Sequence, residues 1–368
     1  MSSTRRSFLS GLGAAASLGA APSRRQLRAE LGIDSYTLRG FGWKAFEMLD
    51  YAASMGLDVV QFSELPHIGT YEQAQEEGYL RRVKARADRL GVRIEMGTWG
   101  VCPTNPRAQK NFKQYGPADE QLRIAIRIAK ILGAKTVRCV MGSGHLRRED
   151  GPLNKHMDAM IRLFKSVRED ALRAGVYIAP ENHKDMRASE MLWMIEQSGV
   201  DYVGATVDTG NPMEVLEDPM ETVEVLAPVA VSSHFRDSVL FAHPRGAAFQ
   251  WTAMGDGSVR IGDVVDRFVE LCPTVPVILE IITGRAPKVL PYREAEFLDA
   301  FPSLSRTALV RFEKLVEQGH PLMAGMMIPD NATEHPAFIE AVKQQQRVDF
   351  ERSVRYLRET VGLRSPGQ

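Results

Sequence analysis

One recurring pattern constrains the fold of this chain more than any other feature. A stretch with apolar residues at helical spacing ends at a glycine, and a short β-branched run follows at once, as seen at Gly56, Gly91, Gly133, Gly175 and Gly199. Glycine is the usual residue directly after a helix, because it adopts a left-handed backbone without steric cost. Successive glycines of this set lie 35, 42, 42 and 24 residues apart, lengths that fit one helix, one strand and their loops. The chain is therefore predicted to be a series of βα units.

The strands of these units predict an α/β fold. A first strand at 31–36 and two later ones at 229–235 and 276–282 bring the expected total to eight. Most are apolar throughout rather than alternating, which is typical of a parallel sheet buried on both faces. Polar residues gather at the C-terminal ends of several strands, where the active sites of barrels lie. We therefore expect a (β/α)8 TIM barrel over residues 28–285, with a doubly wound open sheet as the alternative.

The region after the last predicted strand is unusually long. Residues 286–335 hold several prolines and one predicted helix near 307–318, and residues 336–363 form a long amphipathic pattern. We interpret 336–363 as a C-terminal helix that completes the barrel, and 286–335 as an insertion that extends the final βα loop into a lid near the barrel mouth. The alternative is a helical appendage that serves only packing or formation of a homodimer.

Bulk charge and cysteine content exclude several classes of protein. Lys plus Arg and Asp plus Glu both number 46, so the chain has no net charge that would favour nucleic acid or an anionic membrane surface. The three cysteines form no CxxC pair, which indicates neither a disulfide framework nor a zinc knuckle. No apolar segment reaches the roughly 20 residues of a transmembrane helix, so stable membrane insertion is not expected.

The N-terminal residues 1–25 are set apart from the rest. Thr4-Arg5-Arg6-Ser7-Phe8-Leu9 precedes a mild Ala- and Gly-rich apolar run, and the segment resembles a twin-arginine signal peptide. A basic, unstructured terminus is the alternative. The resemblance implies that the Tat export machinery is a partner, and that the mature protein is periplasmic or otherwise exported.

Four residues are the main candidates for chemistry. Each ends one of four consecutive predicted strands: Glu181, Asp208, His234 and Glu280. Taken singly, a carboxylate after a strand is usually an ion-pair partner and a lone histidine is usually structural. Three carboxylates and an imidazole together form an oxygen-rich set that suits Mn²⁺, Mg²⁺ or Co²⁺ with open positions better than a closed thiolate zinc site. The predicted cofactor is one divalent metal ion, with Mn²⁺ the first choice and Mg²⁺, Co²⁺ or Zn²⁺ as alternatives.

The motifs around these residues carry a family resemblance. P-E-N-H, V-D-T-G-N, H-F-R-D and a Gly-Asp-Gly loop occur in this order, and the chain resembles the xylose isomerase-like TIM-barrel superfamily, within it the sugar phosphate isomerase/epimerase family. The likeness covers about residues 28–285 and the late helix. It implies one divalent metal, commonly Mn²⁺, held by the four candidates, with Glu181 and Glu280 flanking the substrate and carrying its proton. The family includes ketose epimerases, hydroxypyruvate isomerases, and inosose isomerases and dehydratases.

The chemistry explains why such residues are needed. Loss of a proton next to a carbonyl leaves an enediolate whose charge a cation stabilises, while positioned carboxylates take and return the proton. We therefore predict a divalent-metal-dependent isomerase or epimerase that acts through a metal-stabilised enediolate. Because phosphorylated sugars are mainly cytoplasmic, the expected substrate is an unphosphorylated sugar, keto-sugar or cyclitol. The alternatives are a metal-dependent lyase or dehydratase that eliminates from an oxidised sugar or glycoside, and a non-catalytic sugar-binding barrel.

Further residues are expected around the substrate. His183, Asn211 and Arg236 lie two or three positions from candidate ligands and are predicted to bind substrate hydroxyls. The alternatives are that they orient metal ligands, or that Arg236 simply pairs with its neighbour Asp237. Other residues that could line the pocket are Glu64, His67, Trp99, His145, Phe249 and Trp251. An apurinic-site endonuclease is disfavoured, because that branch uses a three-metal cluster with more histidines.

Overall fold

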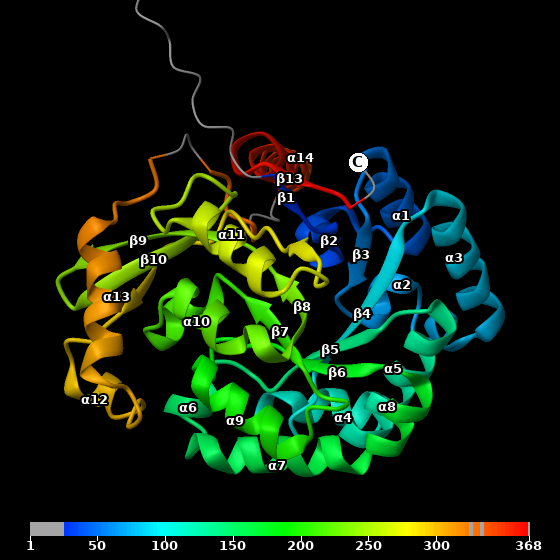
Figure 1. The fold of residues 1–368 in the computed structure, drawn as a ribbon, viewed down its shortest axis with the longest axis horizontal. Coiled ribbons are helices and arrows are strands. Elements are labelled where there is room, and N and C mark those ends of the chain that lie inside the picture. The colour runs from blue at the N-terminus through cyan, green and yellow to red at the C-terminus, as the bar shows by residue number, and fades with distance from the viewer. Residues whose placement is uncertain (1–25, 324–326, 332–334, 367–368) are drawn as a thin grey trace, which may run out of the picture.

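The computed structural model describes residues 26–323, 327–331 and 335–366. Eight strands lie in the middle of the molecule with helices around them (Figure 1). These strands are β2 (Leu31–Asp34), β3 (Val59–Phe62), β4 (Arg93–Gly100), β5 (Thr136–Val140), β6 (Tyr177–Pro180), β7 (Ala205–Asp208), β8 (Ala230–His234) and β11 (Val277–Leu279). Their order along the chain matches the eight strands that the sequence predicts.

These strands pair in parallel around a closed ring. Six of them form one sheet in the order β11-β2-β3-β4-β5-β6, and β7 pairs with β8. A bridge between Ile178 and Val203 joins β6 to the segment just before β7. A bridge between Phe235 and Leu279 joins the end of β8 to β11. The predicted (β/α)8 barrel is confirmed, and the doubly wound alternative is wrong.

Helices on the outside of the ring connect successive strands. They are α1 (Ala45–Ser54), α3 (Glu77–Leu90), α5 (Ala118–Leu132), α7 (Leu153–Ser166) with α8 (Arg168–Ala174), α9 (Ala188–Ser198), α10 (Pro219–Leu226) and α11 (Ile261–Leu271). All residues of β2, β3, β5 and β7 are buried between these helices and the barrel interior. This double burial explains the apolar runs, because neither face of such a strand contacts water.

The recurring glycines end helices much as the sequence predicts. Gly91, Gly133 and Gly175 follow α3, α5 and α8 with φ values of 67°, 74° and 65°, and the N–H of each donates to a carbonyl of the preceding turn. Gly199 differs, because it follows α9 with φ 124° and ψ 109°, outside the left-handed helical region. Most of the predicted stops are thus left-handed C-terminal caps.

An antiparallel sheet that the sequence reading missed follows β8. It contains β9 (Asp237–His243), β10 (Gly246–Thr252) and β12 (Lys288–Leu290), in the order β12-β10-β9. The β9–β10 hairpin pairs over its whole length, from Gly246 with His243 to Thr252 with Asp237. It projects from the ring on the same side as α13 (Figure 1). The insertion after β11 therefore shares a sheet with the loop after β8.

The C-terminal region returns to the barrel wall. It contains α12 (Ala295–Leu298), α13 (Arg306–Gln318), α14 (Pro336–Arg355) and a short π-helical turn at Tyr356–Val361. α14 packs against α1, where the Tyr51 and Phe350 rings lie 6.1 Å apart. The hydroxyl of Tyr356 lies beside Gly262 in α11. α14 and the turn after it thus contact the first and the seventh of the outer helices.

The two ends of the described chain meet. β13 (Leu363–Arg364) pairs in parallel with β1 (Leu27–Arg28).

Among the described helices, none combines the length and the apolar character needed to cross a membrane. The predicted twin-arginine signal, residues 1–25, lies outside the described residues.

The glycine caps generate a stability prediction. A Cβ added to Gly175 would meet no atom within 4 Å, so Gly175→Ala changes only the backbone preference at φ 65°. We expect this variant to lower the free energy of unfolding by about 1 kcal/mol. Gly175→Asn should lose less, because asparagine tolerates the left-handed region. Urea denaturation measures both, and equal stability of the Ala variant and the parent would contradict the role of the cap.

Candidate active site

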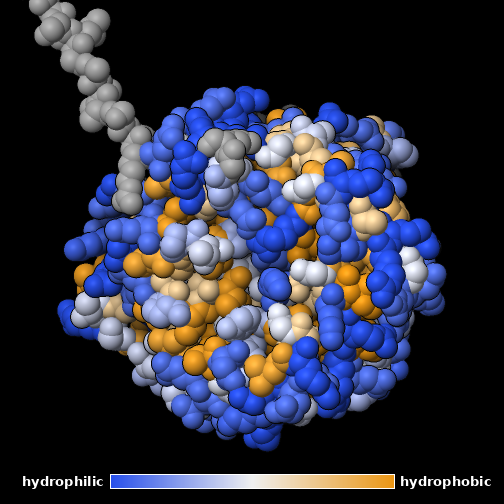
Figure 2. Space-filling model, turned by 45° about the vertical axis from the view of Figure 1, so that its right-hand side comes forward, coloured by the Kyte–Doolittle hydropathy of each residue, from blue (hydrophilic) through white to orange (hydrophobic). Residues whose placement is uncertain are grey.

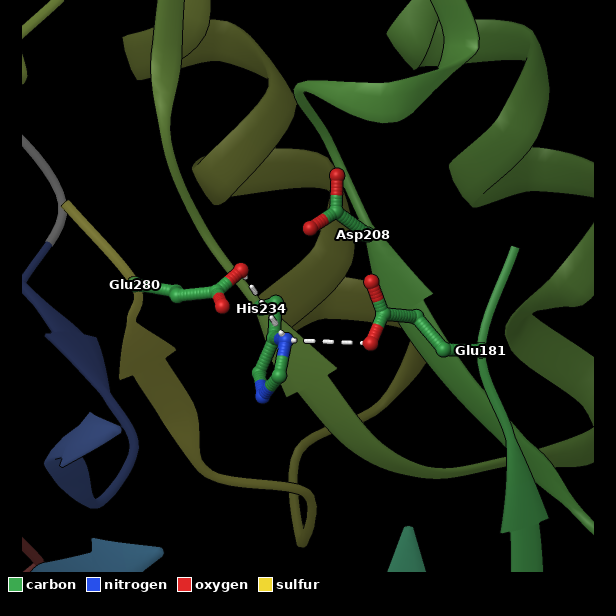
Figure 3. A group of neighbouring side chains, drawn as sticks. All are labelled: Glu181, Asp208, His234 and Glu280. Atoms are coloured by element: carbon green, nitrogen blue, oxygen red, sulfur yellow. Dashed lines mark ion pairs between the residues drawn. The ribbon is translucent and has the colours of Figure 1, made fainter. Parts of the chain in front are cut away.

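The four predicted ligands lie together at the C-terminal ends of neighbouring barrel strands (Figure 3). Glu181 follows β6, Asp208 and His234 end β7 and β8, and Glu280 follows β11. One candidate ligand atom from each lies within 4.8 Å of all the others, and all four side chains are buried. Residues separated by a hundred positions thus meet in one cluster because parallel barrel strands end on the same face.

The orientation of His234 fits a metal ligand. Gln61 on β3 donates its amide N–H groups to Ser232 (3.0 Å) and Glu95 (3.3 Å), so its carbonyl oxygen accepts from His234 Nε2. The other ring nitrogen, Nδ1, is buried without a hydrogen-bond partner and lies 3.4 Å from both Glu181 Oε2 and Glu280 Oε2. A hydrogen bond that fixes the ring and points the opposite nitrogen at a set of carboxylates is the usual arrangement of a metal-binding histidine.

Backbone contacts hold Asp208 in place. Its Oδ1 accepts the N–H groups of Gly210 (2.8 Å) and Asn211 (2.6 Å). Asn182 braces the same strand end, since its amide donates to Asp208 O (2.9 Å) and accepts from Asp208 N (2.8 Å). These contacts leave Oδ2 facing the cluster, where Arg236 Nε donates to it at 3.0 Å.

Two buried arginines compensate the negative charge. Arg138 on β5 donates its Nε to Glu181 Oε2 at 2.6 Å. Arg236 donates to both Asp208 and Glu280 and lies 4.6 Å from the centre of the Trp251 ring. The structure therefore places Arg236 in the cluster itself, and not in the predicted alternative pair with Asp237.

These charges shift the pKa values of the cluster. Burial alone would raise the pKa of Glu181, but Arg138 and His234 outweigh it and hold that pKa well below the usual range. Burial alone would also raise the pKa of Glu280, but Arg236 and His234 lower that pKa to about 2. Burial alone would lower the pKa of His234, whereas Glu280 and Glu181 raise it to about 10. Both glutamates are thus ionised at neutral pH, and the cluster attracts a positive charge at His234.

A cavity of about 470 Å³ opens onto the cluster. Of the predicted residues, those that line it are Glu64, Trp99, His183, Arg236, Phe249, Trp251 and Glu280. His67, His145 and Asn211 lie outside the set of described residues that line this cavity. On the face shown in Figure 2, hydrophilic side chains cover most of the outline, and apolar side chains lie between them in several patches. The cavity thus combines charged groups with aromatic walls, as is common in sites for small molecules.

The predicted substrate contacts divide into two kinds. His183 lines the cavity, and its Nδ1 lies 2.6 Å from the carbonyl oxygen of Gly142, so Nδ1 carries the proton and Nε2 is left as an acceptor. Burial lowers the pKa of His183 to about 3, which keeps the ring neutral. Asn211 is fully buried and donates its amide to Glu181 Oε1 at 2.8 Å. It therefore lies behind a glutamate of the cluster, in the position of a group that orients it.

Sequence reasoning missed several residues of the site. Gln61, Arg138 and Lys184 were not singled out, although each contacts the cluster or lines the cavity. Gln61 and Arg138 lie inside otherwise apolar strands, Val59–Phe62 and Thr136–Val140. A polar residue within such a strand is a usable signal, because in a barrel it can point to the interior.

Comparison with known proteins places this fold and site in a family. A family model described as xylose isomerase-like TIM barrel matches residues 49–301. The chain belongs to this family. A 3-oxo-isoapionate decarboxylase from Pectobacterium atrosepticum is 21% identical over 226 residues, which are 59% of this chain and 71% of that protein.

Solved structures share the fold at low sequence identity. A D-psicose 3-epimerase from Clostridium cellulolyticum H10, crystallised with D-tagatose, superposes with a TM-score of 0.54 at 13% identity, over 88% of this chain and 99% of that one. A xylose isomerase-like TIM barrel protein from Mycobacterium smegmatis, in complex with magnesium, superposes with a TM-score of 0.54 at 14% identity, over 78% of this chain and 98% of that one. Relatives of this chain thus include enzymes of sugar chemistry.

The contact between Gln61 and His234 generates a second prediction. Gln61→Met removes the acceptor for His234 Nε2, so the ring is free to rotate, and we expect any affinity of the cluster for a divalent cation to fall by about 10- to 100-fold. Gln121→Met is the matched control, because Gln121 is also buried but contacts Trp99 and Gly116 instead. Calorimetric titration with Mn²⁺ measures both variants. Equal losses in the two would show that packing, and not orientation of the ring, is responsible.

Proposed function

We propose that this protein is a divalent-metal-dependent isomerase or epimerase of an unphosphorylated sugar, keto-sugar or cyclitol. The observation that supports it is the pair of ionised glutamates, Glu181 and Glu280, which flank the free Nδ1 of His234, with Glu280 in the wall of a cavity of about 470 Å³. Two carboxylates at one point can remove a proton from a carbon next to a carbonyl and return it to another face or to the neighbouring carbon.

The charged state of each glutamate follows from its partners. Arg138 and Arg236 stay protonated, so they hold Glu181 and Glu280 as carboxylates that are ready to accept a proton. The same contacts fix the direction of each carboxylate, which proton transfer depends on. Of the two, Glu280 lines the cavity directly. Asn211 contributes by binding the second oxygen of Glu181.

The donor set suits one divalent cation. Glu181, Asp208, Glu280 and Nδ1 of His234 would hold it, and when bound it would stabilise negative charge on the substrate oxygens after a proton leaves. Three carboxylates and one imidazole favour Mn²⁺ or Mg²⁺ over metals that prefer thiolates. One structural relative was solved in complex with magnesium, which supports the binding of a divalent cation. We propose Mn²⁺ as the first choice.

The nature of the substrate follows from two lines of support. The structural relative with D-tagatose is named for a ketose that carries no phosphate. The predicted export signal would also place the protein away from the cytoplasmic pool of phosphorylated sugars. The second candidate function is a lyase on an oxidised sugar, which the sequence relative named as a 3-oxo-isoapionate decarboxylase favours. The two differ in outcome, since an isomerase exchanges hydrogen with solvent without losing a fragment.

Substitution of Glu280 tests the mechanism. Glu280→Gln removes the carboxylate that accepts the proton while it keeps the shape of the side chain, so exchange of substrate hydrogen for deuterium should fall by at least about 10³-fold. The measurement is mass spectrometry of free ketoses incubated in deuterated water at saturating Mn²⁺, with bound metal quantified in the same sample. Full exchange by a metal-loaded Glu280→Gln protein would rule out the two-glutamate mechanism, and release of a fragment by the parent would select the lyase.

The raised pKa of His234 predicts how pH acts on the metal. Because that pKa is about 10 without a cation, His234 carries a proton at neutral pH that the metal must displace. Apparent affinity for Mn²⁺ should therefore rise about tenfold per pH unit from pH 7 to 9, with about one proton released for each ion bound. Calorimetry at pH 8 in two buffers of different ionisation enthalpy counts the proton. Affinity that is independent of pH would contradict the assignment of Nδ1 as a ligand.

A further inference from the structure

Lys184 has an unusual backbone in the wall of the active-site cavity. It lies in the loop between β6 and α9, and its φ of 70° places a residue with a side chain in the left-handed region. Among the described residues, only Leu216 is another non-glycine with positive φ. Such strain persists where the surrounding structure enforces it, and it is concentrated at sites of function.

Hydrogen bonds on both sides of Lys184 enforce this conformation. His183 Nδ1 donates to the carbonyl oxygen of Gly142 (2.6 Å), and the N–H of Gly142 donates to Asp185 Oδ2 (2.8 Å). The second oxygen of Asp185 accepts the N–H of Met186 at 2.9 Å. The residues before and after Lys184 are thus tied to the same glycine of the loop after β5. The side chain of Lys184 is held in the cavity wall by a rigid turn.

The ammonium group of Lys184 differs from the other cations of the cavity. The others each have a carboxylate partner, in the pairs Arg138–Glu181, Arg236–Asp208, Arg285–Asp330 and Lys288–Glu214. Lys184 Nζ lies 5.2 Å from the centre of the Trp251 ring, and no carboxylate of the described residues forms an ion pair with it. Burial lowers the pKa of Lys184 and outweighs the nearby carboxylates of Glu214, Glu181 and Glu280, none of which forms an ion pair with it.

We propose that Lys184 binds a carboxylate of the substrate, so that the protein acts on a sugar acid, such as a keto-aldonate or a uronate. The reaction on that acid rests on the proposed function, whereas the binding of the carboxylate does not. Lys184 and Glu280 line the same cavity, so one sugar-sized molecule can contact both. Trp251 lies beneath the ammonium group and supplies an apolar wall for the carbon chain.

A carboxylate matches this site better than a phosphate. A phosphate monoester carries roughly −1.5 to −2 charges and offers three acceptor oxygens, so its sites gather several free donors. Here Arg285 is paired with Asp330 and Lys288 with Glu214, which leaves one ammonium group without a counter-ion among the described residues. Lys184 is thus the one cation of the cavity wall that no ion pair among the described residues occupies, and a single ammonium group suits a carboxylate better than a phosphate.

Binding of inert ligand pairs tests the proposal without catalysis. Hexonates (D-gluconate, D-galactonate and D-mannonate) differ from their alditols only in a carboxylate that replaces a hydroxymethyl group, and neither has an aldehyde or ketone group. We expect the Mn²⁺-loaded protein to bind at least one hexonate about tenfold or more tightly than its alditol, by calorimetry. Lys184→Met should reduce that preference by about 10- to 100-fold, the range for a charge-assisted hydrogen bond.

Matched variants make the result specific. Lys184→Arg restores the cation and should keep most of the preference. Arg285→Met removes a cation of the same cavity whose partner Asp330 stays paired with Arg39, so the preference should remain. The proposal is overturned if no hexonate is preferred, if the preference survives Lys184→Met, or if D-glucose 6-phosphate binds more tightly than every hexonate. A hexonate preference without deuterium exchange on any ketose or ketohexuronate would instead reject the proposed function alone.

Discussion

Charge balance inside the barrel mouth is the constraint on which the rest of the site depends. Glu181, Asp208 and Glu280 lie within a few ångströms of one another and are shielded from water. Like charges that close cannot remain ionised in a buried place without positive partners. Arg138 and Arg236 supply two of these partners. The third is the proton on His234, or the cation that would replace it, so the cluster is built to exchange one positive charge for another.

The backbone around the cluster adapts to this requirement. The stem of Arg236 passes so close to Gly210 that a Cβ there would lie 2.3 Å from Arg236 Cγ. The indole of Trp251 closes the other approach and donates its N–H to Gly210 O at 3.1 Å. The β9–β10 hairpin, which carries Trp251, therefore contributes to the active site. It holds an arginine in the position where the charge is needed.

Local patterns explain why much of the fold could be predicted from the sequence. A glycine such as Gly133 marks a helix end by its own backbone preference, and an apolar run such as Thr136–Val140 marks a buried strand without reference to distant residues. The β9–β10–β12 sheet was not predicted, because β12 begins at residue 288, well after the hairpin ends at residue 252, and its pairing depends on the folded arrangement. The four ligand candidates were visible because each ends a strand. Arg138 was not predicted, because an arginine within a strand is usually exposed on the surface. Only the closed barrel shows that this one points to the interior.

The pairing of β1 with β13 joins the beginning of the described chain to its end. Leu27 leaves the ribosome long before Leu363, its partner in this parallel pair, and almost the whole barrel lies between them in the sequence. During synthesis the first segment must therefore wait without its partner until the last one is made. An incomplete nascent chain lacks this closure and presents an unpaired edge, whereas the finished chain hides it. A chain that stops before residue 363 therefore leaves β1 without its strand partner, so this closure is one of the last steps that the described fold can complete.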